Sequence, residues 1–214
     1  MNLDDLIGKI TCADCLDILK QLPDKCVDLV LTDPPYGIGA SNISFRNGNN
    51  KTGGDRFMDK SWDNKKICQK YFEELFRVSK NQVIFGWNYY SNIMPTCRCF
   101  IVWDKTIHGN SYADCEIAFT SFDKVARVIP VNMVFTTQDG RIHPTQKPLK
   151  LFETILQDYS KENDLVLDCF SGSGTTAVAC HNLKRRFICI EKDPEYWKAS
   201  CERLEQAQRQ QMLF

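Results

Sequence analysis

The hydrophobic pattern of the chain alternates between short, wholly apolar runs and longer amphipathic stretches. The apolar runs lack the polar alternation of a half-exposed strand, which is typical of strands buried on both faces of a parallel sheet. The longer stretches repeat apolar residues at helical spacing, so each predicts a helix with one buried face. We therefore expect strands at 9–12, 27–32, 83–86, 100–103, 117–119, 165–167 and 187–190, further strand structure within 125–134, and helices at 15–22, 67–78, 146–159, 176–183 and 195–208.

This alternation of strands and helices predicts an α/β fold with a doubly wound sheet, in which helices cover both faces. The length of 214 residues fits one domain of ordinary size. No internal repeat and no break in composition divides the chain. We expect a single domain over residues 1–214.

Residues 37–64 interrupt the pattern with a segment rich in Gly, Asn, Ser, Lys and Arg. Connections in compact domains usually have about 4 to 6 residues, and much longer ones are mostly functional or disordered. We predict a mobile loop over a site, while a plain surface loop fits the composition equally well.

A glycine turn at 168–176 joins a predicted strand to a predicted helix. Such a turn brings backbone amides and the positive end of the helix dipole to one point, where a nucleotide-type cofactor can bind. Gly172, Gly174 and Ala177 satisfy a loose dinucleotide fingerprint, which does not separate nicotinamide, flavin and S-adenosylmethionine. Glu191 ends the next apolar run, at about the offset of roughly 20 residues where a carboxylate meets ribose hydroxyls. A tight turn without a ligand is the alternative.

Asp33-Pro34-Pro35-Tyr36 ends another predicted strand. Two prolines fix the backbone direction, and they leave carbonyl oxygens and the Asp33 carboxylate to face the crevice at the strand end. The aromatic ring of Tyr36 offers a flat face for stacking. The motif therefore suits a planar group that carries an amine, and a proline-rich turn without function is the alternative.

Composition narrows the class of protein. The apolar fraction of 43% and the charged fraction of 25% are those of a soluble globular protein, and the formal net charge is zero. No apolar run approaches the roughly 20 residues of a membrane span, so we expect a cytoplasmic protein without membrane contact. The eleven cysteines have poor metal-ligand spacing, and several lie in apolar runs, so we expect reduced thiols and no metal.

Three motifs in this order resemble the S-adenosylmethionine-dependent DNA amino-methyltransferases. They are Asp33-Pro34-Pro35-Tyr36, His143-Pro144-Thr145-Gln146-Lys147-Pro148 and Phe170-Ser171-Gly172-Ser173-Gly174-Thr175-Thr176. The catalytic motif precedes the cofactor motif, which resembles the β class of that family. The resemblance covers about residues 10–197, and it implies a permuted Rossmann-like methyltransferase sheet.

The resemblance also implies roles for individual residues. Asp33, Pro34, Pro35 and Tyr36 would be catalytic and would hold a flipped base by its amine. A helix N-cap is the alternative role for Asp14, and a solvated charge is the alternative for Lys147. His143 is expected to act structurally or beside the cofactor, and His108 and His181 are expected to be ordinary surface or helix residues. The residues expected to bind S-adenosylmethionine are Asp14, Cys15, Asp33, Thr145, Lys147, Asp168, Phe170, Ser171, Gly172, Ser173, Gly174, Thr175, Thr176 and Glu191.

The expected substrate is double-stranded DNA, methylated at adenine N6. Aspartate at the head of the catalytic motif is commoner among adenine enzymes of the family, whereas serine is commoner among cytosine N4 enzymes, which are the alternative. Residues 105–142, roughly 35 in number, would form a minimal target-recognition insertion, since an independent domain needs about 50. Members of the class often dimerise, and the sequence specifies neither a dimer nor a partner nuclease. Less favoured are methyltransferases of RNA or protein amides, an NAD-dependent oxidoreductase and a non-catalytic DNA-binding module.

Overall fold

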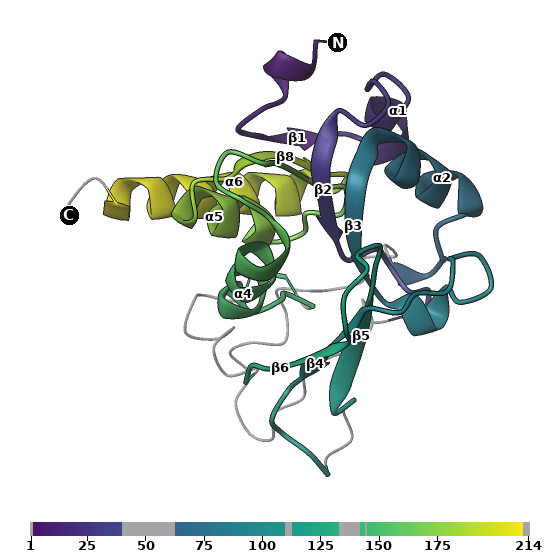
Figure 1. Cartoon of the computed structure of the whole chain (residues 1–214). Coiled ribbons are helices and arrows are strands. Elements are labelled where there is room, and N and C mark those ends of the chain that lie inside the picture. The colour runs from purple at the N-terminus through teal and green to yellow at the C-terminus, as the bar shows by residue number, and fades with distance from the viewer. Residues whose placement is uncertain (1, 40–62, 110–112, 133–141, 144, 212–214) are drawn as a thin grey trace.

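The computed structural model describes residues 2–39, 63–109, 113–132, 142–143 and 145–211. Within them, eight strands form one sheet in the order β1-β8-β7-β2-β3-β5-β4-β6 (Figure 1). The strands are β1 (Lys9–Cys12), β2 (Val27–Thr32), β3 (Ser79–Phe85), β4 (Phe100–Asp104), β5 (Cys115–Thr120), β6 (Arg127–Pro130), β7 (Leu165–Asp168) and β8 (Arg186–Glu191). The helices are η1 (Leu3–Asp5), α1 (Cys15–Leu19), α2 (Gln69–Val78), η5 (Trp87–Tyr89), α4 (Leu149–Tyr159), α5 (Thr175–Asn182) and α6 (Pro194–Gln211).

The sheet is parallel from β1 through β8, β7 and β2 to β3. β5 then runs antiparallel between β3 and β4, and β6 lies parallel to β4 at the edge. β2 and β7 are direct neighbours, with Leu29 opposite Val166 and Val30 opposite Leu167. The two strands that carry the predicted motifs therefore lie side by side and end at the same edge, although they are far apart in sequence.

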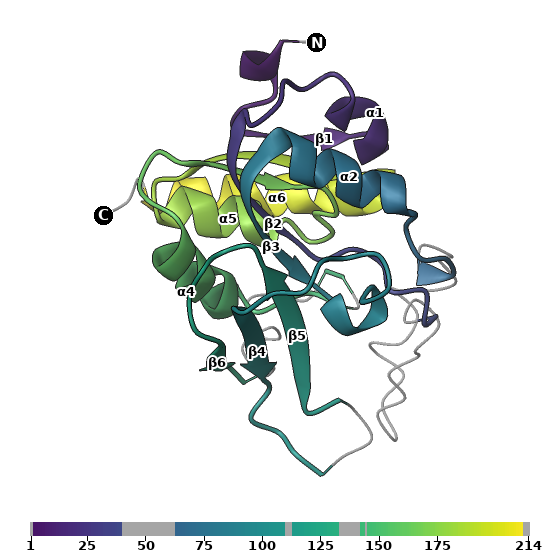
Figure 2. The ribbon, with the colours of Figure 1, turned by 45° about the vertical axis from the view of Figure 1, so that its right-hand side comes forward.

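Helices cover both faces of the sheet (Figures 1 and 2). Side chains of α4, α5 and α6 pack on one face in one core cluster, and those of α1 and α2 pack on the other face in a second cluster. Successive side chains of β2 divide between the clusters, since Leu29 and Leu31 join the first and Val30 joins the second. This confirms the doubly wound α/β arrangement and explains why the strands are apolar on both faces.

The predicted elements agree with the structure except at some ends. α4 begins at Leu149 rather than at residue 146, because Pro148 is its N-cap with an extended backbone (φ −60°, ψ 135°). β3 begins at Ser79, four residues before the predicted 83. Ser79 and Gln82 of its polar start are buried, and Gln82 Nε2 donates to Ser79 Oγ at 2.8 Å, whereas Lys80 between them is exposed.

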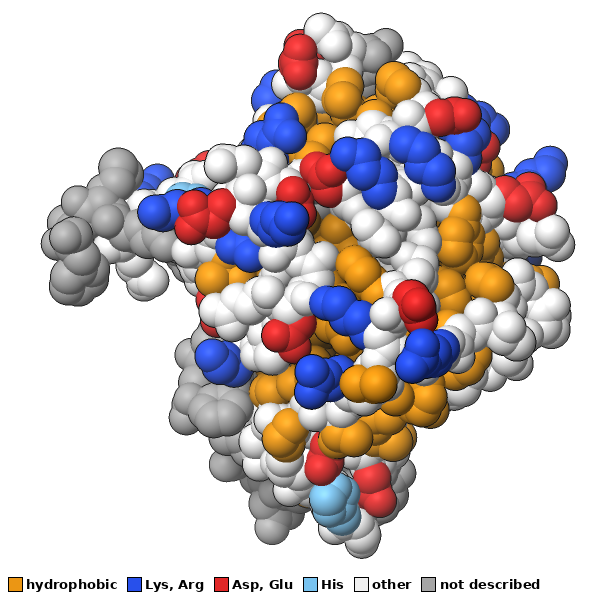
Figure 3. Space-filling view, viewed as in Figure 1, with side chains coloured by type: hydrophobic (Ala, Val, Ile, Leu, Met, Phe, Trp, Pro, Cys, Tyr) orange, Lys and Arg blue, Asp and Glu red, His pale blue; other side chains and the backbone are white. Residues whose placement is uncertain are grey.

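The two predicted functional segments lie partly outside the described residues, namely at 40–62, 110–112 and 133–141. Where the first segment is described, Asp63 joins its two ends: its Oδ1 accepts from the Gly37 amide at 2.8 Å and its Oδ2 from the Ile38 amide at 3.3 Å. Asp63 is 1% exposed, so the acceptor side of this link is buried next to the catalytic motif. On the face shown in Figure 3, lysine and arginine side chains lie among acidic and apolar ones rather than in one continuous field.

Candidate active site

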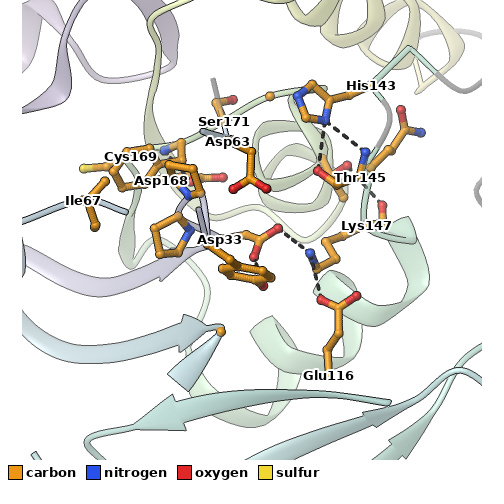
Figure 4. A pocket seen from close by; sticks show the side chains of 18 of the residues that line it. Asp33, Asp63, Ile67, Glu116, His143, Thr145, Lys147, Asp168, Cys169 and Ser171 are labelled. Carbon is orange, nitrogen blue, oxygen red and sulfur yellow. Dashed lines mark hydrogen bonds and ion pairs between the residues drawn. The ribbon is translucent and has the colours of Figure 1, made fainter. Parts of the chain in front are cut away.

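A cavity of about 1310 Å³ lies at the edge of the sheet where β2, β7 and β8 end (Figure 4). Ligand pockets usually measure roughly 300–1,000 Å³, so this cavity has room for more than one small group. Of the predicted catalytic and cofactor-binding residues, those on its wall are Asp14, Cys15, Asp33, Pro34, Pro35, Tyr36, Thr145, Lys147, Asp168, Phe170, Ser171, Gly172, Ser173, Thr175, Thr176 and Glu191.

Gly174 is the predicted site residue that the structure places away from the cavity wall. It is the N-cap of α5 and has a left-handed backbone with φ 73°, a conformation that favours glycine. A Cβ atom at this position would lie 3.0 Å from Cβ of Ser200 on α6. This glycine therefore permits the turn and the close approach of α6, and its contact with the cofactor stays a prediction.

The Asp33 carboxylate is held by two donors at the base of the cavity (Figure 4). The Tyr36 hydroxyl donates to its Oδ1, and the Lys147 ammonium donates to its Oδ2. Burial raises the pKa of Asp33 above its usual range, against the opposing charge of Lys147. Burial alone would lower the pKa of Lys147, but the charges of Asp33 and Glu116 raise it, so this side chain stays protonated. At 6% exposure, Lys147 is not the solvated charge that the sequence left as an alternative.

Glu116 and Lys105 complete a buried ionic chain that the sequence did not predict. Glu116 lies on β5, where its Oε2 is 3.0 Å from the Lys147 ammonium and its Oε1 is 2.9 Å from that of Lys105. Burial opposes ionisation of Glu116, but the charges of Lys147 and Lys105 outweigh it and lower its pKa. The sequence signal that could have indicated this pair was weak: an acid, Glu116, at the start of an apolar strand, and a lysine, Lys105, just after the preceding strand.

Aromatic side chains form the wall beside the catalytic motif. The Tyr36 ring stacks on Tyr89, with ring centroids 4.7 Å apart and planes inclined by 16°. The Tyr90 hydroxyl donates to the Pro35 carbonyl oxygen. Within the described residues, no hydrogen bond reaches the Pro34 carbonyl, so the Pro34 oxygen is the acceptor that the motif leaves for a ligand.

Replacing Gly86 by alanine is expected to displace Tyr36. Gly86 has φ +74°, and a Cβ atom there would lie 2.1 Å from Tyr36 Cε1, which a real Cβ contact does not tolerate. We expect Gly86→Ala to lower the free energy of unfolding by roughly 1–3 kcal/mol and to reduce turnover more than cofactor binding. Urea unfolding, turnover and cofactor titration measure the three effects.

Gly8→Ala is the matched control for this substitution. Gly8 has φ +78°, but nothing lies within 4 Å of its added Cβ atom, so it carries the backbone strain without the collision. Equal turnover losses in Gly86→Ala and Gly8→Ala would contradict the importance of the position of Tyr36.

Asp168 lies at the end of β7 and is held by neutral donors. Its Oδ1 accepts from Thr32 Oγ1 at 2.6 Å and from the Phe170 amide at 3.1 Å, while Oδ2 accepts from Thr176 Oγ1. Burial raises the pKa of Asp168 to about 6, against these hydrogen bonds. The hydrogen bonds therefore orient an acid that no neighbouring cation neutralises in the described part of the chain.

Glu191 ends β8, and Asp14 follows the neighbouring strand β1. Glu191 Oε2 accepts from the Gly172 amide at 2.7 Å, and this bond ties the end of β8 to the glycine turn. Burial raises the pKa of Glu191. Asp14 caps α1 through the Leu16 amide at 3.0 Å, as the alternative role predicted, and it also pairs with Lys192 at 2.8 Å on the cavity wall.

His143 lies beside the glycine turn rather than beside Asp33. Its Nδ1 accepts from the Thr145 amide at 3.3 Å, and its ring packs edge-on against Tyr196 with centroids 4.3 Å apart. The ring also lies 3.6 Å from the position of an added Cβ on Gly172. This place agrees with the expected structural role beside the cofactor segment. His108 is exposed and pairs with Asp104, also as expected.

The chemistry of the cavity wall suits a cationic, nucleoside-like ligand. In the described residues, no lysine or arginine forms an ion pair with Asp168 or Glu191, so two largely buried carboxylates face the cavity without a cation. S-adenosylmethionine carries a positively charged sulfur and an ammonium group, together with ribose hydroxyls. The residues present therefore fit this cofactor.

The chain is similar to known DNA methyltransferases. The sequence model of the N6/N4 methyltransferase family, described as a DNA methylase, matches residues 99–202. The type II methyltransferase M.HinfI of Haemophilus influenzae is 26% identical over 258 residues, covering 95% of this chain and 70% of the relative. These matches support a DNA amino-methyltransferase of the N6/N4 class. YubD, a protein described as a methylase in Escherichia coli (strain K12), is 28% identical over 92% of this DNA methyltransferase and 89% of its own length.

Solved structures of similar proteins confirm the fold, and one of these proteins was solved in complex with S-adenosylmethionine. The crystal structure of the M1.HpyAVI–SAM complex has a TM-score of 0.63 and 27% identity, over 92% of this chain and 99% of that chain. The cytosine-N4-specific PvuII DNA methyltransferase has a TM-score of 0.60 at 16% identity, over 94% and 89% of the two chains, and this similarity concerns the fold alone.

The described residues hold neither a membrane-spanning helix nor a metal-binding cluster. No helix there is both long and apolar enough to cross a membrane. No group of three or more His, Cys, Asp or Glu side chains there is placed to hold a metal ion.

Proposed function

We propose that this methyltransferase transfers a methyl group from S-adenosylmethionine to the N6 amine of adenine in double-stranded DNA. The observation that carries the proposal is that Asp33-Pro34-Pro35-Tyr36 and the glycine turn at 168–176 lie on the wall of one cavity. Because β2 and β7 are neighbours, a cofactor at the turn and an amine at Asp33 would share that cavity. The aspartate at the head of the motif supports adenine over cytosine.

The amine end of the site is assigned to Asp33 and Pro34. The exocyclic amine of adenine is a poor nucleophile because its lone pair is delocalised into the ring. Hydrogen bonds from the amine to the Asp33 carboxylate and the Pro34 carbonyl would favour a more tetrahedral nitrogen and would stabilise the positive charge that develops on it. The proton leaves the nitrogen after methylation, so the site needs no separate general base.

The cofactor end is assigned to the residues that the glycine turn and the strand ends place on the cavity wall. S-adenosylmethionine supplies a methyl carbon bonded to a positively charged sulfur. Asp168 would bind the ammonium group, Glu191 the ribose hydroxyls, and Asp14 would lie beside the adenine ring. The remaining contacts would come from Cys15, Thr145, Phe170, Ser171, Gly172, Ser173, Thr175 and Thr176.

The decisive experiment combines the purified protein, methyl-labelled S-adenosylmethionine and genomic DNA that lacks adenine methylation. Digestion to nucleosides should release the label as N6-methyladenine, and mapping the modified positions would then give the recognition sequence. Label in N4-methylcytosine would replace the base assignment and keep the reaction. Intact cofactor binding without label in DNA would contradict the proposed substrate.

A further inference from the structure

We propose that Glu116 is a positioning residue that receives the Lys147 ammonium when a target amine takes its place at Asp33. The inference rests on the proposed function, in which the amine donates to Asp33. Its basis is the chain Asp33–Lys147–Glu116–Lys105, in which Lys147 lies between two carboxylates (Figure 4).

Both oxygens of Asp33 are occupied by donors. Tyr36 donates to Oδ1 and Lys147 to Oδ2, so an incoming amine meets a carboxylate whose two oxygens each already accept from one donor. The Lys147 ammonium is, like the target amine, a nitrogen that donates hydrogens to this carboxylate. Each carboxylate oxygen has a further lone pair, so the amine competes with these donors for Asp33, and the competition is relieved when one of them moves away.

Lys147 is the donor with a second anion within reach. Glu116 Oε2 lies 3.0 Å from its ammonium, so a short movement exchanges one carboxylate for another. The side chain of Lys147 is 6% exposed, and burial of an unpaired ammonium costs several kcal/mol. Without Glu116, the departure of Lys147 from Asp33 would incur that cost, and the amine would have to compete with the full ion pair.

Lys105 sets how strongly Glu116 attracts Lys147. Its ammonium lies 2.9 Å from Glu116 Oε1, and the four charges of the chain sum to zero. Lys105 therefore keeps Glu116 from holding Lys147 permanently. The balance predicts that the loss of Glu116 and the loss of Lys105 act in opposite directions on Lys147, and hence on Asp33.

The groups that act on Asp33 define the expected pH dependence. The charge of Glu116 raises the pKa of Asp33, and the charge of Lys147 lowers it. Removal of the Glu116 charge should thus shift the acid limb of the pH–rate profile to lower pH. Removal of Lys105 strengthens the pull of Glu116 on Lys147, and this should shift the limb to higher pH. The other titratable groups that face Asp33 are Tyr36, Tyr90 and Asp168.

The test measures kcat, KM for DNA and the S-adenosylmethionine dissociation constant of the full chain from pH 5 to 9. We expect Glu116→Gln to lower kcat/KM for DNA about 10- to 100-fold, with cofactor affinity within about twofold, and Glu116→Asp to recover most of the loss. Lys105→Met should move the acid limb in the direction opposite to Glu116→Gln.

Two outcomes overturn the inference. Wild-type kinetics in Glu116→Gln would do so, as would losses in both variants with an unmoved acid limb, which a purely structural role would produce. Asp33→Ala in the same assay distinguishes a failure of the proposed function from a failure of the role of Glu116. An active Asp33→Ala would contradict the proposed function, whereas an inactive Asp33→Ala beside a normal Glu116→Gln would contradict only the role of Glu116.

Discussion

Replacing Asp33 by alanine is expected to abolish methyl transfer while the dissociation constant for S-adenosylmethionine changes by less than about tenfold, or 1.4 kcal/mol. The Asp33 carboxylate follows β2 and lies on the same cavity wall as Asp168 and Glu191. Its loss removes an acceptor for the amine but leaves the proposed cofactor contacts at Asp168 and Glu191. The measurements are single-turnover methylation of DNA and calorimetric titration with the cofactor.

Asp28→Ala is the matched control for this substitution. Asp28 belongs to β2, the strand that Asp33 follows, is also partly buried, and also pairs with a lysine, Lys80, at 2.7 Å. It lies at the opposite end of β2, where its Oδ2 accepts from the Leu165 amide at 2.8 Å. We expect Asp28→Ala to lower stability slightly and to keep activity. A similar loss of turnover in both variants, or equal losses of turnover and cofactor binding in Asp33→Ala, would contradict the assignment of Asp33 to the amine.

Replacing Asp168 by asparagine is expected to stabilise the free protein at alkaline pH and to weaken cofactor binding. Burial raises the pKa of Asp168 to about 6 from its ordinary value of 3.8. An acid with a raised folded-state pKa favours folding most below its unfolded pKa, and this contribution is lost as the pH rises through about 6. At about 1.4 kcal/mol per pKa unit, the ionised carboxylate costs about 3 kcal/mol above pH 7.

Asparagine keeps the shape of the side chain and does not titrate. The Thr176 hydroxyl can turn to accept from the new amide, and Thr32 can continue to donate to the remaining oxygen. Urea unfolding should therefore show Asp168→Asn to be more stable than the wild type at pH 8, with the difference vanishing near pH 4. Loss of a charged hydrogen bond to the cofactor ammonium costs about 1.5–3 kcal/mol, so affinity should fall roughly 10- to 100-fold.

Asp28→Asn is a control that is expected to change the stability at pH 8 in the opposite direction. Burial opposes ionisation of Asp28, but hydrogen bonds from Lys80 and the Leu165 amide, together with nearby positive charges, outweigh it and lower the pKa, so this carboxylate stabilises the fold above its unfolded pKa. Asp28→Asn should be the less stable variant at pH 8. Unchanged cofactor affinity in Asp168→Asn would remove Asp168 from the proposed cofactor site.

Local rules predicted the layers of the fold and the composition of the cavity wall. An apolar run such as 165–167 favours a buried strand, and apolar residues at helical spacing, as in 67–78, favour a helix with one buried face. The motifs after β2 and β7 were informative because strand ends, prolines and glycines restrict the backbone. Their meeting in one cavity followed from the parallel pairing of the two strands.

The charged chain behind Asp33 could not be predicted in the same way. Glu116 is at a strand position where an alternating acid usually faces water, and its partner Lys147 is 31 residues away in sequence. Their contact depends on how β5 pairs with β3 and on the extended path before α4, which no local pattern encodes. The packing of α6 against Gly174 was unpredicted for a related reason, since Ser200 of α6 is distant in sequence from the glycine turn.

The strand order also has a consequence for synthesis of the protein. β1 and β2 flank the pair formed by β8 and β7, so strands from the beginning of the chain await neighbours from its end. Lys9 pairs with Ile188, and Leu29 with Val166, so neither early strand can complete its hydrogen bonds until most of the chain has left the ribosome. Pairings this distant fold slowly and leave strand edges exposed to other chains. The nascent polypeptide is therefore expected to need chaperone protection until β7 and β8 emerge.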